Sequence, residues 1–366
     1  MRNKRLRRFV VLTALMLGMT LTLIGCMQTR IVDRIKILTV LGVDQKNGLY
    51  QTIGLYMDHM ENDRIKSIHG EGDTVELMLS QMNMQSPHTI QTGKLRMLVF
   101  SRRMAEQGLD SFLHTFCRSP ITSTSMILAV SEEPPQEMFQ SLKGKNREGL
   151  PYHLIEQNVT SDNAPLNNLH IFLFNCYGTG RDAFAPYLKR NKYGKIEFTG
   201  LGIFQYDRLK LVLDAKETLL LKMMKGRGKG GILPVQINAG SEEHVAALSL
   251  LKEEPSMHFA LDHGEALKMT IDLHLIGMLK EIPRMNMRSE ITYKYTVSEL
   301  EQQINDNAIK LLNKLRDNGV DPLGLGDFVR GHQRSWDEED FYKREYPRMR
   351  FEVHTHLTLK ESGIGY

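Results

Sequence analysis

Hydrophobic residues along the chain follow two patterns, a strict alternation typical of strands and a spacing of three to four residues typical of amphipathic helices. The strand pattern occurs at residues 35–43, 49–56, 94–100, 121–130, 195–206, 209–213, 265–277 and 350–359. The helical pattern occurs at residues 73–84, 102–117, 150–160, 165–177, 214–224 and 298–316, and Pro134-Pro135 opens a further short helix. Because both kinds are frequent and strictly alternating βαβ units are absent, the pattern predicts an α+β fold with mixed or antiparallel sheets and helices packed on them.

Turn and capping residues indicate where several of these elements begin and end. Asn-Gly within residues 44–48 predicts a hairpin at the start of the fold, and Asp207-Arg208 predicts a second hairpin. The predicted helix ends are Asp73, Asp214 and Ser298 as N-caps, with Glu217 and Glu301 completing two capping boxes, and Gly319 as a terminator.

The N-terminus has a different character from the rest of the chain. Five basic residues precede an apolar run at residues 9–24, which is shorter than the roughly 20 residues that span a bilayer and ends at Leu23-Ile24-Gly25-Cys26. This is the form of a bacterial lipobox, in which the cysteine sulfur receives a diacylglycerol before the signal peptide is removed. We therefore predict a signal peptide at residues 1–25 and lipid attachment at Cys26, where the acyl chains would hold the protein at a membrane. An uncleaved membrane anchor is the alternative, and it also places the remaining chain outside the cell.

The chain that remains after the signal exceeds the usual domain size of about 100–150 residues, which predicts two or three domains. Residues 191–195 are polar and turn-rich, so we expect an N-terminal α+β domain or domains at residues 26–194 and a C-terminal α+β domain at residues 195–366. Much of the net charge of +4 comes from the signal, and nothing in the charge pattern indicates nucleic-acid binding.

Three features resemble chemical sites, but each is better interpreted otherwise. Residues 226–231, Gly-Arg-Gly-Lys-Gly-Gly, resemble a phosphate-binding loop but follow a helix and lack the Gly-Lys-Ser/Thr ending, which favours a flexible basic loop. His354 and His356 share one face of a strand and could hold a metal, yet their polar neighbours favour a solvated surface. Trp336 could be an exposed binding anchor, although an aromatic packed on the core is preferred.

The sequence predicts no catalytic residue, no cofactor and no metal ligand. The common hydrolase and metal motifs do not occur in it. Besides Cys26, the chain has Cys117 and Cys176, which could form a disulfide outside the cytoplasm; two buried unpaired thiols are favoured.

A series of short motifs in a fixed order resembles the Ger(x)C lipoproteins, the C subunits of spore germinant receptors. The motifs are Arg30-Ile-Val-Asp33 after the lipobox, Leu41-Gly-Val-Asp44, residues 93–100, Ala105-Glu-Gln-Gly108, residues 200–204 with 207–212, and Asp321-Pro-Leu-Gly-Leu-Gly326 followed by Trp336 and Phe341. Met27 and Ile31 depart from the family pattern, which usually has tryptophan and an acidic residue there. The resemblance implies an α+β fold of several domains, no catalytic activity, and a three-subunit receptor with a polytopic A subunit and a permease-like B subunit.

Taken together, these observations favour a non-catalytic lipoprotein subunit of a germinant receptor, needed for nutrient-triggered spore germination. The expected location is the spore inner membrane, at the outer face of the bacterial cytoplasmic membrane. A stand-alone extracytoplasmic solute-binding lipoprotein is the alternative, and a cell-surface hydrolase ranks third because no catalytic constellation is visible.

Overall fold

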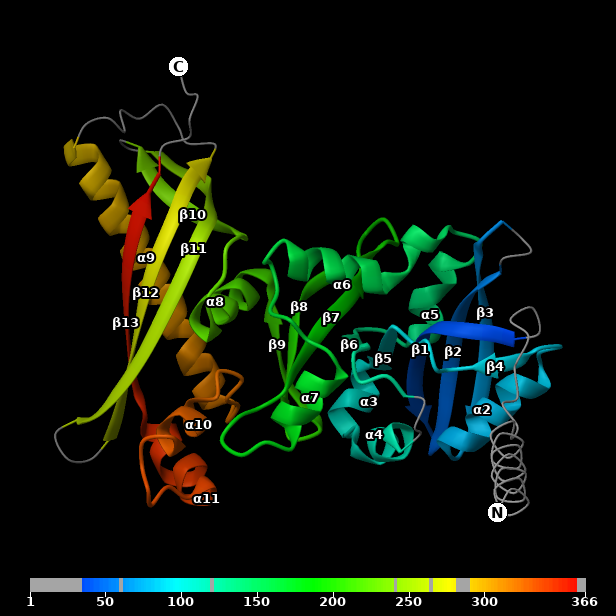
Figure 1. Cartoon of the computed structure of the whole chain (residues 1–366). Coiled ribbons are helices and arrows are strands. Elements are labelled where there is room, and N and C mark those ends of the chain that lie inside the picture. The colour runs from blue at the N-terminus through cyan, green and yellow to red at the C-terminus, as the bar shows by residue number, and fades with distance from the viewer. Residues whose placement is uncertain are drawn as a thin grey trace, which may run out of the picture.

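A computed structural model describes residues 35–58, 62–118, 122–239, 242–262, 266–280 and 290–360. The described residues form two sheets, which stand side by side with helices around and between them (Figure 1). The predicted signal peptide and Cys26 lie outside the described residues. None of the helices in these ranges is long and apolar enough to cross a membrane.

The first sheet combines parallel strands at its centre with antiparallel strands on both sides. Its strands are β1 (Ile35–Lys46), β2 (Leu49–Asp58), β3 (Arg64–Gly72), β4 (Thr89–Gln91), β5 (Met97–Ser101), β6 (Ile127–Ser131), β7 (Phe184–Arg190), β8 (Ile196–Gln205) and β9 (Arg208–Asp214). They are ordered β3-β2-β1-β5-β6-β7-β8-β9, and β4 pairs with the start of β1. Because β1, β5, β6 and β7 are parallel, they all begin at the same edge of the sheet, which we call the strand-start edge.

Helices cover both faces of the first sheet. They are α2 (Val75–Met84), α3 (Arg102–Gln107), α4 (Asp110–Cys117), α5 (Pro135–Met138), α6 (Pro151–Thr160) and α7 (Leu169–Cys176), with 3-10 turns at Phe139–Leu142 and Arg147–Gly149. One core lies between the sheet and α2, α3, α4 and α7, and another lies between the opposite face and α5 and α6. Since both faces are covered, all five residues of β5 and of β6 are buried.

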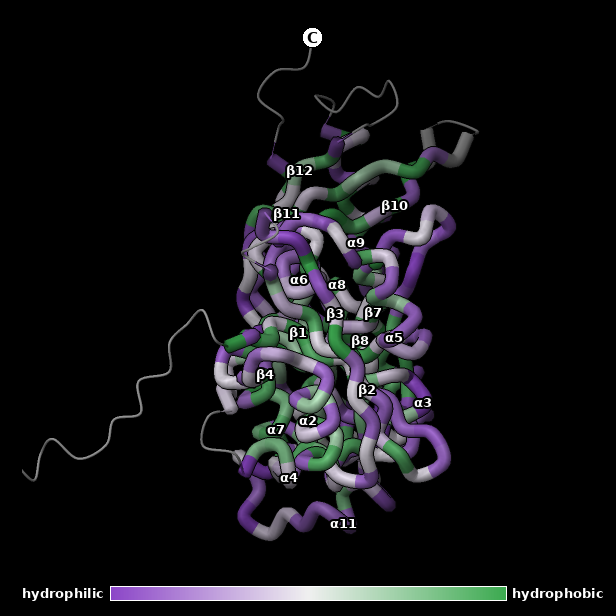
Figure 2. The backbone as a smooth tube through the Cα atoms, turned by 90° about the vertical axis from the view of Figure 1, so that its right-hand side faces the viewer, coloured by the Kyte–Doolittle hydropathy of each residue, from purple (hydrophilic) through white to green (hydrophobic). Residues whose placement is uncertain are grey.

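The second sheet is built from long strands in the order β10-β11-β12-β13. These are β10 (Ile232–Ala239), β11 (Glu242–Asp262), β12 (Ala266–Lys280) and β13 (Arg350–Leu359); the associated helices are α8 (Ala215–Lys225), α9 (Glu290–Asp317), α10 (Leu325–Arg330) and α11 (Glu338–Asp340), followed by π-helical and 3-10 turns at Phe341–Glu345 and Tyr346–Arg348. Buried and less buried residues alternate along β13 because one face of the sheet is packed and the other is solvated. Figure 2 shows hydrophobic stretches along the inner strands and hydrophilic stretches at the outer turns.

A third hydrophobic core continues from the first sheet into the second. Leu201 and Leu213 of the first sheet belong to it, together with Leu221 of α8, Leu273 of β12 and Leu311 of α9. The two sheets are therefore joined through α8 by a continuous apolar contact, and polar groups gather around this contact.

The α+β fold class, the opening hairpin and the last strand are confirmed. Asn47 and Gly48 both have positive φ, as a tight hairpin turn requires, and the final strand covers Arg350–Leu359 as predicted. The capping box at Asp214 and Glu217 is present, and Gly319 follows the end of α9 with φ +66°. Strands β8 and β9, which follow the predicted domain division between residues 194 and 195, pair with β7, and the division itself stays a prediction.

Several predicted boundaries were wrong. The cap of α2 is Thr74 rather than Asp73, and the predicted helix at 102–117 is two helices separated at Gly108, which has φ +124°. Helix α9 begins at Glu290, so Ser298 lies inside it. The carboxylate of Glu301 instead accepts a hydrogen bond from the backbone of β13.

Candidate functional site

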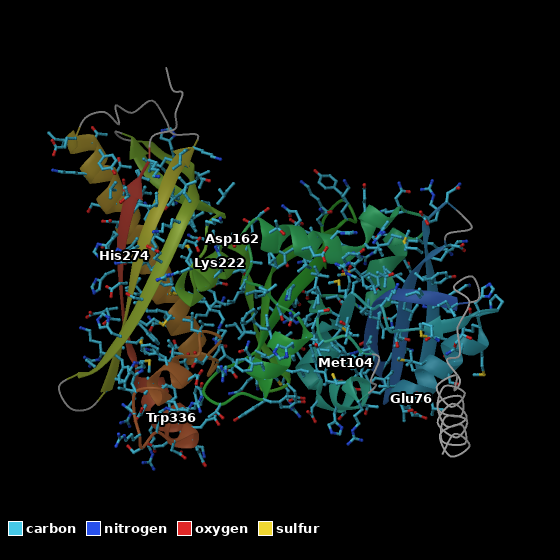
Figure 3. All side chains as sticks on the ribbon, in the orientation of Figure 1. Glu76, Met104, Asp162, Lys222, His274 and Trp336 are labelled. Atoms are coloured by element: carbon cyan, nitrogen blue, oxygen red, sulfur yellow. The ribbon has the colours of Figure 1, made fainter. Side chains whose placement is uncertain are left out.

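The region between the two sheets is the candidate functional site, because charged side chains are buried there. Asp162 follows α6 of the first unit, Lys222 lies on α8, and Glu253 lies on β11 of the second sheet. Figure 3 shows Asp162 and Lys222 next to each other at this junction.

Lys222 links the two units through an ion pair that is buried from solvent. Its Nζ lies 2.7 Å from Oε2 of Glu253, which is 0% exposed, and 3.7 Å from Oδ1 of Asp162. Burial raises the pKa of Glu253, while the bond to Lys222 opposes this. The other carboxylate oxygen of Glu253 has no hydrogen-bond partner among the described residues. The carboxylate therefore depends on Lys222 for its compensation.

The glycine-rich segment at residues 226–231 is packed against this ion pair. Gly228 exchanges two backbone hydrogen bonds with Glu253, and the backbone N–H of Lys229 donates to Oδ2 of Asp162 at 2.8 Å. A Cβ on Gly228 would overlap Lys222 Nζ and lie 2.7 Å from Glu253 Oε2. The prediction of a flexible loop was therefore wrong at this position, where a glycine lets the backbone approach two charged groups.

An open cleft of about 670 Å³ lies over the same groups. Its lining combines the acidic residues of the junction with several cations, and it includes Asp162, Arg227, Lys229, Lys252, Glu253, Glu254 and Lys360. The cleft thus presents charges of both signs from both units.

A second polar cluster lies at the other side of the junction, around Asp321. This carboxylate is 1% exposed and accepts the backbone N–H groups of Gly324, Leu325 and Gly326 at 2.8–2.9 Å. The hydroxyl of Tyr342 donates a fourth bond at 3.0 Å. Burial raises the pKa of Asp321, and these four donors, at the N-terminus of α10, work against that rise.

The loop before β7 docks onto this cluster. Asp182 and Asp321 exchange two bonds, since Asp182 Oδ2 accepts the N–H of Asp321 at 2.7 Å and the N–H of Asp182 donates to the carbonyl of Asp321 at 2.9 Å. Burial raises the pKa of Asp182 to about 7, and the neighbouring Asp321 adds to the rise. The units therefore meet through a carboxyl that titrates near neutral pH.

Gly180 allows the closest approach within this loop. It has φ +78°, its carbonyl accepts the N–H of Asp327 at 2.7 Å, and its own N–H donates to Glu338 at 2.8 Å. A Cβ there would overlap the nitrogen of Asp327 and lie 2.7 Å from the carbonyl carbon of Gly326. Arg181 forms an ion pair with Asp327 at 3.1 Å, so the loop is held by both backbone and charge.

The side chains considered from sequence as chemical sites do not come together. His356 stacks on His274 with ring centroids 4.9 Å apart, whereas His354 lies 3.6 Å from Glu352. No group of three or more His, Cys, Asp or Glu side chains is placed to hold a metal within the described ranges. Trp336 is partly buried and packs on Phe341, as the preferred interpretation expected.

The two cysteines of the folded part are unpaired. Cys176 is buried and its Sγ donates to the carbonyl of Tyr206 at 3.2 Å, whereas Cys117 is only partly buried. Burial raises the pKa of Cys176 to about 12, so this thiol remains protonated at neutral pH.

Motifs quoted from the sequence hold the fold at close contacts. Asp44, at the end of β1, is buried and bonds Ser101 and Arg103 at the start of α3. A Cβ on Gly42 would overlap Pro135 of α5. The motif that begins at Asp321 forms the second polar cluster of the junction.

Comparisons with known proteins cover nearly the whole chain. The spore germination protein N-terminal domain family matches residues 28–190, and the spore germination B3/GerAC-like C-terminal family matches residues 199–363. Spore germination protein GerQC of Bacillus cereus is 23% identical over 96% of this chain and 98% of its own length. Spore germination protein B3 of Bacillus subtilis strain 168 is 20% identical over 89% of this chain and 90% of its own length.

A solved structure has the same fold. The crystal structure of the GerBC protein superposes with a TM-score of 0.60 over 87% of this chain and 96% of that chain, at 17% sequence identity. Both family domains are present here in order, and together they account for most of the chain. The protein therefore belongs to the GerAC-like, or Ger(x)C, family of spore germination proteins.

Proposed function

We propose that this protein is a non-catalytic, lipid-anchored subunit of a germinant receptor, acting in nutrient-triggered germination at the outer face of the spore inner membrane. The observation that carries the proposal is the match of both family domains along the chain, together with relatives named as spore germination proteins. Its partners would be the two integral-membrane subunits, A and B. Lipid on Cys26 would attach it to the membrane.

The junction between the sheets supports a structural role within such a complex. Its carboxylates are bound by backbone N–H groups, a tyrosine hydroxyl and a lysine ammonium, which fixes how the two units stand to each other. A subunit that contacts two partners needs such a fixed surface, because each patch must keep its position relative to the other.

The test is an affinity purification of the tagged protein from detergent-solubilised spore inner membranes. Two integral-membrane proteins should co-purify with the wild type and be depleted with Cys26→Ala. Cys117→Ala is the matched control, since it also removes a thiol but leaves the lipobox intact. Recovery of the lipoprotein alone in mild detergent would refute the receptor assignment.

The cleft at the junction favours one second candidate, a stand-alone extracytoplasmic lipoprotein that binds a solute. The cleft is large enough for a small molecule and is lined by charges of both signs. Tight binding of a solute by the isolated soluble part, with no co-purifying membrane proteins, would support this candidate over the receptor subunit.

A further inference from the structure

We propose that the strand-start edge of the first sheet faces the lipid surface, with Tyr206, Tyr177 and Met84 at the membrane interface. The proposal rests on the proposed lipid attachment at Cys26. It goes further by naming which side of the molecule meets the bilayer.

The length of chain between Cys26 and the fold limits where the membrane can be. Nine residues separate Cys26 from Ile35, the first residue of β1, and nine residues span at most about 30 Å. Ile35 lies at the strand-start edge, because Val40, five residues later, is already level with Met97 at the start of β5. The lipid must therefore lie within about 30 Å of this edge.

Tyr206 occupies the same edge from the other side of the sheet. Strand β8 runs antiparallel to β7, so its end lies beside the beginning of β7, with Ile203 opposite Phe184. Tyr206 is in the turn that follows and is 69% exposed. Four strand spacings of about 4.8 Å separate β8 from β1, which is about 19 Å and within reach of the same membrane surface.

Tyr177 and Met84 complete the exposed set at this edge. The hydroxyl of Tyr177 donates to Asp110 at 2.6 Å, and the N–H of Asp110 donates to Asp207 in the turn beside Tyr206. Met84 is 78% exposed at the end of α2, which is held close to the start of β1. The contacts that hold it there are the bond from the Ile90 N–H to Asn83 Oδ1 and the pairing of Ile90 with Lys36.

Other exposed apolar side chains are badly placed for the same surface. Ile291 and Tyr295 lie on α9 and Val245 lies on β11, in the second unit, which stands at the far side of the molecule from α2 (Figure 1). Tyrosine rings prefer the interface between hydrocarbon and water, since the ring is apolar and the hydroxyl stays hydrated. The strand-start edge thus combines the attachment point with side chains that suit a lipid interface.

Strand β8 supplies a matched pair of positions for the test. Tyr206 follows its end at the strand-start edge, whereas Tyr193 precedes its beginning at the opposite edge and is 74% exposed. Ten residues of strand separate the two turns, which is about 33 Å. The chain has one tryptophan, Trp336, so Trp336→Phe gives a background in which a single new tryptophan reports its own surroundings.

The full-length lipoprotein carrying Trp336→Phe with Tyr206→Trp, Met84→Trp or Tyr193→Trp is reconstituted into vesicles of phosphatidylcholine and phosphatidylglycerol. Some vesicles contain lipid brominated on the acyl chains, which quenches tryptophan on contact. We expect quenching at residues 206 and 84 to be about threefold or more that at residue 193, as interfacial side chains require. Thermal melting of each variant checks that the fold is kept.

The outcomes separate the orientation from the anchor. Co-flotation of the protein with vesicles, and the mass of the peptide containing Cys26, are measured on the same samples. Floating protein with equal quenching at residues 206 and 193 overturns the proposed orientation and leaves the anchor in place. Protein that neither floats nor carries lipid on Cys26 overturns both.

Discussion

Removing the ammonium of Lys222 should destabilise the fold at neutral pH by a predictable amount. In Lys222→Met, the carboxylate of Glu253 loses its 2.7 Å partner and stays buried, so it takes up a proton instead. Protonating a carboxyl with an ordinary pKa of 4.5 at pH 7 requires 2.5 units at about 1.36 kcal/mol each, or about 3.4 kcal/mol. This agrees with the loss of about 3–5 kcal/mol found when one partner of a buried pair is removed.

The measurement is thermal unfolding followed by circular dichroism. We expect the melting temperature of Lys222→Met to fall by about 6–12 °C at pH 7, from about 2–4 °C for each kcal/mol. Adding Glu253→Leu should restore at least half of the loss, because the unpaired carboxyl is then gone. Lys294→Met is the control, since its ion pair with Glu290 at 2.6 Å is exposed on both sides and should leave the melting temperature nearly unchanged.

The pH dependence gives the stricter check. In Lys222→Met the folded-state pKa of Glu253 lies above its unfolded value, so its contribution is present below about pH 4.5 and is lost as pH rises. The deficit relative to wild type should therefore be small near pH 4.5 and full at pH 7. An unchanged melting temperature at pH 7, or a double variant as unstable as the single one, would show that Glu253 does not depend on Lys222.

Three further predictions concern the same junction. Gly228→Ala should lower the melting temperature by several degrees because its Cβ would displace Lys222, whereas Gly226→Ala, which meets nothing within 4 Å, should not; equal effects would contradict the packing argument. The pKa of Asp182 is raised to about 7, so its stabilising contribution is complete below about pH 4 and is lost as pH rises through 7; melting temperatures at pH 5–9 should fall with pH more steeply in the wild type than in Asp182→Asn, and parallel curves would refute this. Under limited proteolysis, α9 should stay associated with β13, since Glu301 and Tyr293 of α9 bond the backbone of β13; release of α9 alone during gel filtration would refute one domain containing both.

Sequence patterns predicted elements where local chemistry is decisive. The capping box at Asp214 and the alternation of β13 depend on residues within one element, and both are present. The start of α9 was placed eight residues too late, because the serine–glutamate spacing at Ser298 resembles a cap although the helix continues through it. Strands β10 and β11 were not predicted, since interior charges such as Glu253 interrupt the apolar pattern.

The buried ions of the junction could not be predicted from sequence, although one signal was available. Lys222 stands among Leu219, Leu220, Leu221, Met223 and Met224 on an otherwise apolar stretch of α8, and a lysine there is either exposed by the helix turn or paired inside. Its partners Glu253 and Asp162 are 31 and 60 residues away, so only the tertiary fold brings them together. The glycines at residues 226–231 were visible, but the close approach that requires them was not.

The arrangement of charges explains why a hydrophobic core alone would not fix the two units. The shared core of Leu201, Leu221 and Leu273 favours contact but tolerates sliding, because apolar attraction has no direction. The polar groups restrict the choice, since Glu253 and Asp321 are buried and lose their partners in any other register. We therefore expect paired hydrophobic replacements, such as Lys222→Met with Glu253→Leu, to keep stability but to widen the range of angles between the units. Distance distributions between spin labels on the two sheets should broaden in this variant, and an unchanged width would show that the core alone sets the angle.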